Sequence, residues 1–167
     1  MFVMTYRMEQ QRQERNRRIL FVVLAIAATA AGAVIASMLT KTDTPWYLAL
    51  KLSPIQPPPW VFGAVWTALY VLLAISFARM AAHPRVSRIV IIGFIVNIVL
   101  NALWSPVFFL MNRPRWSLVI LAALIANLII LMRNIARVDR LSFRLLIPYL
   151  CWLCIATFLN ASVVVLN

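Results

Sequence analysis

Residues 97–109 read NIVLNALWSPVFF, an apolar stretch that nevertheless contains two asparagines, a tryptophan and a proline. On an α-helix at about 100° per residue, four polar or aromatic side chains fall within roughly 60° of one another: Asn97, Asn101, Trp104 and Phe108. Lipid tails offer an amide no hydrogen-bond partner. We therefore expect this stripe to face protein or a bound molecule instead of lipid.

The composition of the whole chain places this stretch in a membrane. The 167 residues are 64% hydrophobic and 12% charged, and the mean hydropathy is +0.92. A soluble domain of this size could not cover so much apolar side chain with so few charges. Five apolar runs approach the roughly 20 residues that span a bilayer as a helix: Ile19–Leu39, Val61–Ala82, Ile89–Met111, Trp116–Met132 and Leu145–Leu166. The sequence predicts an all-α integral membrane protein, a bundle of five transmembrane helices.

A basic tail precedes this bundle, and one long loop interrupts it. Residues 1–18 form a basic polar N-terminal tail, expected to be a frayed helix or disordered, and residues 19–167 form a single five-helix transmembrane domain. The loop between the first two helices contains SPIQPPPW at residues 53–60. Its four prolines fix the backbone, so the segment is expected to be stiff and extended. A stiff apolar loop suits either a lid over a cavity or a simple linker.

The charges are strongly one-sided, with 16 Lys and Arg against four acids and a net charge of +12. Twelve of the cations lie in the tail and in the second and fourth loops, against four in the first and third loops. Positive residues concentrate on the cytoplasmic side of membrane proteins. The pattern predicts a cytoplasmic N-terminus and makes a nucleic-acid partner unnecessary as an explanation. The helical form of the spans favours a bacterial inner membrane.

Two further helices carry aromatic stripes. Phe62, Trp66 and Tyr70 share one face of the second helix, and Trp152 precedes Ala156 by one turn on the fifth. A deep tryptophan needs a partner for its indole N–H. From the residues alone, both helix packing and an aromatic ligand cavity remain open.

Several chemistries are not indicated. No Asp, Glu, Lys or Arg of the kind that marks ion pathways lies inside the spans. The one histidine, His83, lies in a loop, so a His-ligated metal or haem within the helices is excluded and no metal site is expected. Cys151 and Cys154 lie in an apolar run, where packing of small residues explains them better than redox chemistry. Ala28, Gly32 and Ala36 likewise favour close packing within the chain over a dimer seam.

An ordered series of motifs, at residues 20–160, resembles the TspO/MBR family of tryptophan-rich sensory proteins, called translocator protein in mitochondria. The motifs take in all six tryptophans. They are Trp46-Tyr47-x-x-Leu50, Pro57-Pro58-x-Trp60-Val61-Phe62, Val65-Trp66-x-x-Leu69-Tyr70, Asn101-x-x-Trp104-x-Pro106-x-Phe108-Phe109, Trp116-x-Leu118 and Pro148-Tyr149-Leu150-x-Trp152-x-x-x-Ala156-Thr157-x-Leu159-Asn160.

The resemblance implies a five-helix bundle, often a homodimer, whose first loop closes over a pocket for porphyrins and benzodiazepine-type drugs. Carried over by motif, the ligand-binding residues are Tyr47, Trp66, Asn101, Trp104, Trp116, Trp152 and Ala156. The implied function is a membrane receptor or sensor that binds tetrapyrroles such as protoporphyrin IX and influences their handling, with porphyrin as ligand and no required cofactor.

Two alternatives accompany this reading. Trp66 and Trp152 match tryptophans that some bacterial members need for light- and oxygen-dependent degradation of protoporphyrin IX, which would make the chain an enzyme. A transporter of porphyrins or other small apolar molecules is weakened by the missing intramembrane charges. The chain also departs from the family at Leu52, Ser53 and Ile55, where members usually carry Lys-Pro and a later Trp. The lid is therefore expected to close differently and to grip a ligand less tightly.

Overall fold

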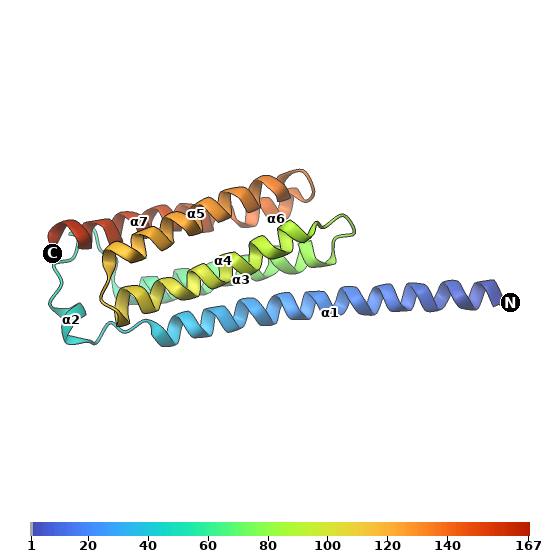
Figure 1. Cartoon of the computed structure of the whole chain (residues 1–167), viewed down its shortest axis with the longest axis horizontal. Helices are drawn as coiled ribbons and strands as arrows, with labels where there is room; N and C mark the ends of the chain where they lie inside the picture. The colour runs from blue at the N-terminus through green and yellow to red at the C-terminus, as the bar shows by residue number, and fades with distance from the viewer. Residues whose placement is uncertain (1) are drawn as a thin grey trace.

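The computed structural model describes residues 2–167, with side chains from Met8 onward. Within that range every regular element is a helix. The elements in chain order are α1 (Phe2–Leu39), α2 (Pro45–Leu48), α3 (Pro59–Ala82), α4 (Arg88–Ser105), η1 (Pro106–Leu110), α5 (Pro114–Ala136), α6 (Arg140–Leu145) and α7 (Ile147–Leu166). Five helical stretches are long and apolar enough to cross a membrane. The expected five-helix transmembrane bundle is confirmed, and the chain is a multi-pass membrane protein (Figure 1).

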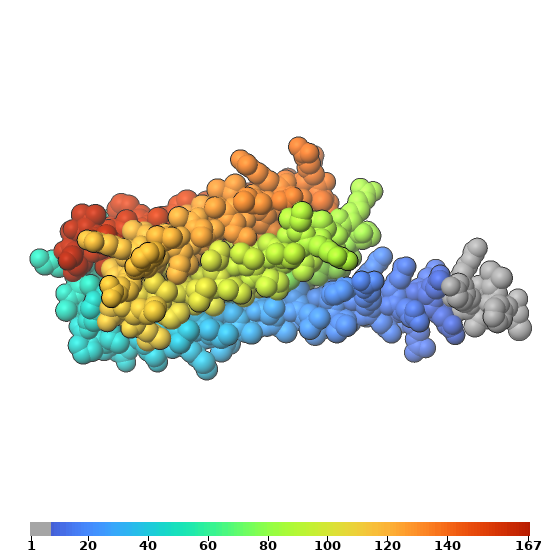
Figure 2. All heavy atoms as spheres, viewed as in Figure 1, coloured from blue at the N-terminus to red at the C-terminus, as the bar shows by residue number. Residues whose placement is uncertain are grey.

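The basic tail is helical where it was expected to be frayed or disordered. Between residues 8 and 18 it continues α1 without a break, and every side chain there is exposed. Figure 1 shows α1 extending well past the ends of the neighbouring helices, and Figure 2 shows this segment standing clear of the bundle. A helix boundary at residue 19 is therefore absent from the described part of the chain.

The small residues of α1 pack within the chain, as expected. Gly32 and Ala36 are buried and Ala28 is partly buried, and a Cβ atom added at Gly32 would overlap the Cγ2 atom of Ile98 on α4. Close helix approach of this kind needs side chains no larger than those present. The stripe therefore sets the distance between α1 and α4.

Pro106 changes the form of the fourth span without ending it. Because proline has no N–H to donate, α4 stops at Ser105 and the chain continues as the π-helical turn η1. The N–H of Met111 donates to the carbonyl of Pro106 at 2.9 Å, five residues back. Asn112 then adopts a positive φ of 55° and reverses the chain into α5. The π turn re-aims the aromatic residues that follow Pro106.

The bundle has two distinct ends. The lid end is where α2 lies, and the basic end is where α3 meets α4 and α5 meets α6 (Figure 1). At the basic end Asp139 caps α6 and accepts 2.9 and 3.2 Å hydrogen bonds from the Arg79 guanidinium. These bonds, with one from the Ser142 hydroxyl, hold the pKa of the Asp139 carboxyl well below its usual range. The pair joins the α5–α6 corner to α3.

Candidate functional site

A hydrogen-bonded chain of side chains crosses the middle of the bundle; we call it the amide network. The Nδ2 of Asn101 donates to the hydroxyl of Tyr149 at 2.6 Å, and that hydroxyl donates to the Oδ1 of Asn97 at 3.1 Å. The Nδ2 of Asn97 donates to the Oδ1 of Asn127 at 3.1 Å. At the other end, the hydroxyl of Tyr70 donates to the Oδ1 of Asn101 at 3.1 Å. The network therefore joins α3, α4, α5 and α7.

The network includes both asparagines of the apolar stretch at residues 97–109. Asn97 is 0% exposed and Asn101 is 3% exposed, and both atoms of each amide have a protein partner. The resemblance implied that Asn101 binds a ligand. In the structure its carbonyl faces Tyr70 and its amino group faces Tyr149, so its orientation is fixed before any ligand arrives.

Three tryptophans lie one helical turn from the network, toward the lid end; we call them the indole layer. Trp104 follows Asn101 by three residues on α4, and Trp152 follows Tyr149 by three residues on α7. Both helices run toward the lid end (Figure 1). Trp66 precedes Tyr70 by four residues on α3, which runs the opposite way. The spacing places all three indoles on the lid side of the same hydrogen-bonded layer.

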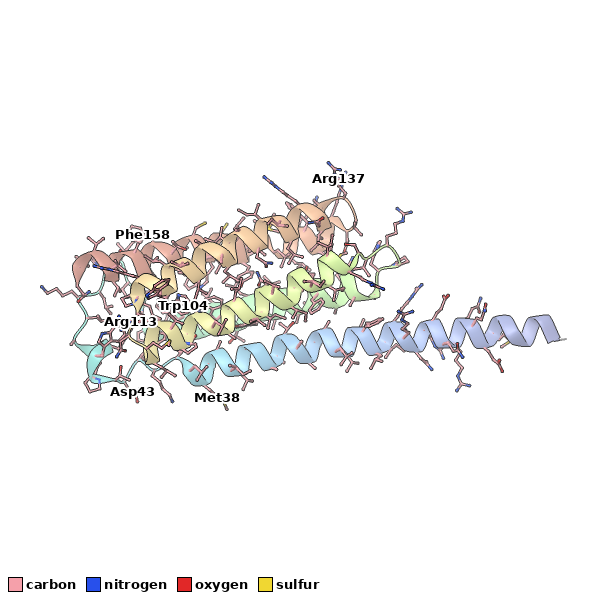
Figure 3. All side chains as sticks on the ribbon, viewed as in Figure 1. Met38, Asp43, Trp104, Arg113, Arg137 and Phe158 are labelled. Carbon is pink, nitrogen blue, oxygen red and sulfur yellow. The ribbon has the colours of Figure 1, made fainter. Side chains whose placement is uncertain are left out.

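Ring contacts support this arrangement. The centroid of Trp66 lies 5.9 Å from that of Tyr70 and 6.3 Å from that of Tyr149. Trp152 packs edge-on against Phe62 of α3 at 5.8 Å. Trp104 points inward from α4, into the space between that helix and the pair α5 and α7 (Figure 3). Trp152 is buried, and Trp66 and Trp104 are half-buried.

Two of these indoles have an unsatisfied donor. The Nε1 atoms of Trp104 and Trp152 are buried and have no hydrogen-bond partner among the described residues. Trp152 as a whole is 9% exposed. A buried donor without an acceptor costs about 1–3 kcal/mol, and most buried polar groups avoid this state. The two unpaired N–H groups mark a place where hydrogen-bonding capacity is kept free.

The lid end of the site is closed by aromatic contacts. Trp46 of α2 packs edge-on against Phe108 at 5.7 Å, and Tyr47 packs against Phe109 at 5.4 Å. Phe108 in turn stacks on Trp104, with centroids 5.4 Å apart. The loop from residue 40 to 58 thus packs on Phe108 and Phe109, and these two rings contact Trp104 of the indole layer. This contact favours the lid over the linker, the two readings that the sequence left open.

Polar contacts hold the lid in place. Thr44 caps α2 by accepting from the N–H of Tyr47. The side chain of Asn167 accepts from the N–H of Lys51 at 3.0 Å and donates to its carbonyl at 3.2 Å. Burial raises the pKa of the Tyr47 hydroxyl, while a hydrogen bond with Gln56 lowers it. Tyr47 is therefore a neutral phenol at physiological pH.

The structure brings most of the residues implied by the resemblance to this site. Tyr47 lies in the lid, Asn101 in the amide network, and Ala156, 8% exposed, one turn beyond Trp152 toward the lid end. Trp116, at the start of α5, is 64% exposed and belongs to neither of the two hydrophobic clusters. An exposed tryptophan at a helix end is typical of the membrane interface.

The described residues also form a shallow surface hollow beside the lid. It measures about 370 Å³ and lies between Ser53 and Pro54 of the lid and the last turns of α7, including Phe158 and Val165. A second hollow, about 540 Å³, lies at the basic end beside Arg133. Both are separate from the indole layer, whose rings pack against neighbouring Tyr and Phe rings.

Sequence reasoning missed the hydrogen-bonding role of Tyr70 and Tyr149 and did not identify Asn127. The usable signal was spacing: Tyr70 is one turn from Trp66, and Tyr149 is one turn from Trp152. Asn127 is the one amide in the apolar middle of its helix, between Ala126 and Leu128. Such a residue needs an acceptor or donor on a neighbouring helix.

Comparisons with known proteins identify the family of the chain. A family model described as the TspO/MBR family matches residues 21–166. The tryptophan-rich protein TspO of Chlorobaculum tepidum is 32% identical over 156 residues, covering 91% of this chain and 99% of the relative. The protein CrtK of Rhodobacter capsulatus is 33% identical, covering 89% and 92%. The human translocator protein is 30% identical, covering 71% and 72%. The chain belongs to the TspO/MBR family.

Proposed function

We propose that the protein is a membrane receptor or sensor that binds tetrapyrroles such as protoporphyrin IX in the indole layer. One observation carries the proposal: Trp66, Trp104 and Trp152 come from three different helices and lie between the amide network and the aromatic lid. Indole rings offer flat area for stacking against a conjugated guest. A relative from Cereibacter sphaeroides, 30% identical, is named a tryptophan-rich sensory protein.

Binding requires the lid to move. With Trp46 and Tyr47 packed on Phe108 and Phe109, the rings leave the indole layer covered. A ligand of tetrapyrrole size must displace these contacts. Benzodiazepine-type drugs, which the resemblance also implies, would enter by the same movement. The departure at Leu52 affects this step, because Leu52 packs against the cluster of Phe108, Phe109 and Val163.

The test is a titration with protoporphyrin IX in the dark, which separates binding from photochemistry. We expect saturable quenching of tryptophan fluorescence and a matching change in porphyrin emission. Trp152→Phe removes the stacking area and should weaken binding by about tenfold, as expected for roughly 1–2 kcal/mol of aromatic contact. Trp60→Phe is the control, because Trp60 is 73% exposed at the start of α3. Quenching that never saturates, or that both variants change equally, would contradict the proposal.

We further propose that the protein lies in a bacterial inner membrane with its N-terminus in the cytoplasm, and that it forms a homodimer. The support for the orientation is charge: the basic end of the bundle and the tail together carry twelve of the sixteen cations. The support for the dimer is the family resemblance. Lipid is then the second partner of the chain, in contact with the exposed apolar faces of all five spans.

A further inference from the structure

Two arginines border the hollow at the basic end of the bundle. Arg133 and Arg137 line this space of about 540 Å³, together with Asn134 and Ala136 of the same segment. The two arginines are four residues apart at the end of α5, so their side chains start on one face with Cβ atoms about 5–6 Å apart. Figure 3 shows Arg137 on the outer side of the corner between α5 and α6. We call this place the arginine hollow.

The two guanidinium groups are held close together without a counter-charge. Among the described residues the one ion pair joins Arg79 to Asp139, so Arg133 and Arg137 have no carboxylate partner there. Both side chains are exposed. The dipole at the end of α5 attracts each cation separately, but like charges four residues apart on a helix repel each other. An anion between the two groups would remove this repulsion and bond to both.

The arginine hollow lies where α5 leaves the hydrocarbon of the membrane. Arg133 directly follows the apolar run that ends at Met132. Ile130, one turn earlier, is 56% exposed, so an acyl chain can lie against α5 beside the hollow. The Nδ2 of Asn134 donates to the carbonyl of Ile130 at 2.8 Å, and in the part of the chain that the structure describes its Oδ1 has no partner. Apolar surface, two cations and a free acceptor thus follow one another along α5.

We propose that the arginine hollow binds one anionic glycerophospholipid, such as phosphatidylglycerol. The phosphate lies between the guanidinium groups of Arg133 and Arg137, and an acyl chain lies along Ile130. A guanidinium donates two parallel N–H groups to phosphate oxygens, a geometry that an ammonium group cannot match. The hollow is many times larger than the roughly 30 Å³ that one water occupies, so it has room for a headgroup. The Oδ1 of Asn134 would accept from a headgroup hydroxyl.

This inference goes beyond the proposed tetrapyrrole function and does not depend on it. The arginine hollow is at the basic end of the bundle, and the lid with its aromatic contacts is at the other end (Figure 1). Protoporphyrin IX binding should therefore be the same with and without the two arginines. Failure of porphyrin binding would leave the lipid site in place, and failure of lipid binding would leave the receptor in place.

Native mass spectrometry of the full chain in detergent counts the bound lipids directly. Dioleoyl phosphatidylglycerol and dioleoyl phosphatidylcholine have the same acyl chains, and only the first has a net negative charge. We expect one phosphatidylglycerol to bind about tenfold more tightly than phosphatidylcholine. Arg133→Gln combined with Arg137→Gln should abolish that preference.

A matched control removes the same charge from the same end of the bundle. Arg85→Gln combined with Arg88→Gln changes two exposed arginines between α3 and α4 that do not line the hollow. This control should keep the tenfold preference for phosphatidylglycerol. An equal loss of preference in both double variants would overturn the inference, because general surface charge would then explain the binding.

Two further arms complete the test. Arg133→Lys combined with Arg137→Lys retains the charge, and it replaces the glutamine variant if tryptophan fluorescence shows that the latter is unfolded. It should keep a preference of about threefold, because an ammonium group lacks the guanidinium fork, and a folded lysine variant without any preference would overturn the inference. sn-Glycerol 3-phosphate, a free phosphate without acyl chains, should not displace the lipid at equal concentration. Displacement at that concentration would likewise overturn the assignment to a lipid.

Discussion

At the scale of single residues, the buried amides and the buried indole N–H groups of the site differ in whether they have hydrogen-bond partners. Asn97 and Asn101 are buried and their amides are fully occupied by protein partners, whereas the indole donors of Trp104 and Trp152 are buried and free. The sequence predicted that Asn97, Asn101 and Trp104 share a stripe, because helical geometry fixes that. It could not predict which of them keep free hydrogen-bonding atoms, since this depends on tyrosines from two other helices.

Asn127 is the residue whose replacement tests the amide network. It is half-buried on α5, and its Oδ1 accepts from Asn97. Asn127→Leu leaves the Nδ2 of Asn97 buried and without that acceptor, so we expect a loss of about 1 kcal/mol in the free energy of unfolding. The control is Asn134→Leu, because Asn134 is exposed and bonds only to the carbonyl of Ile130 on its own helix. Reversible unfolding in mixed micelles measures the free energy of unfolding of both variants. Equal values would contradict a stabilising role for the hydrogen bond between Asn97 and Asn127.

At the scale of elements, helix packing separates two glycines that look alike in the sequence. At Gly32 an added Cβ would overlap Ile98, whereas at Gly63, on α3, it would meet nothing within 4 Å. Gly32→Ala should destabilise the protein by about 1–3 kcal/mol, because the overlapping atom is the Cγ2 methyl of buried Ile98, a β-branched side chain that is stiff at χ1. Gly63→Ala should stabilise it by up to about 1 kcal/mol, because alanine favours the helix.

The measurement for both glycine variants is the thermal midpoint in the same detergent, with tryptophan fluorescence confirming an intact fold. Opposite signs are the expected result. A neutral Gly32→Ala variant would mean that α1 can move away from α4 at no cost. The small-residue stripe would then not set their separation.

The elements also show where sequence reasoning stops. The five runs were located correctly because hydropathy over about 20 residues is set by the bilayer. The form of the fourth run after Pro106 was not predicted. A missing N–H predicts a bend, but whether the helix kinks or widens into a π turn depends on the residues that surround it. Here Phe108 and Phe109 must meet Trp46, Tyr47 and Trp104, and the π turn accompanies those contacts.

At the scale of the whole molecule, the fold and the lid follow from different kinds of information. Apolar segments of sufficient length predict the bundle, and the order of the motifs indicates the family. The position of the lid depends on long-range contacts. Leu52 and Trp46 pack against the cluster that contains Phe108 and Phe109, and the N–H of Lys51 donates to the side chain of Asn167. No local pattern in SPIQPPPW reveals such partners, which is why lid and linker remained equal alternatives until the structure placed the loop against Phe108 and Phe109.

Charge asymmetry across the whole molecule gives the last prediction, the orientation in the membrane. In a variant lacking Cys151 and Cys154, single cysteines are introduced as Asp43→Cys in the lid loop and as His83→Cys between α3 and α4. A membrane-impermeant maleimide should label position 43 in intact spheroplasts and position 83 only after permeabilisation, because the twelve cations of the tail and basic end favour the cytoplasm. The reverse labelling would place the basic end outside. The lid would then open toward the cytoplasm, and a cytoplasmic pool would become the source of any ligand for the indole layer.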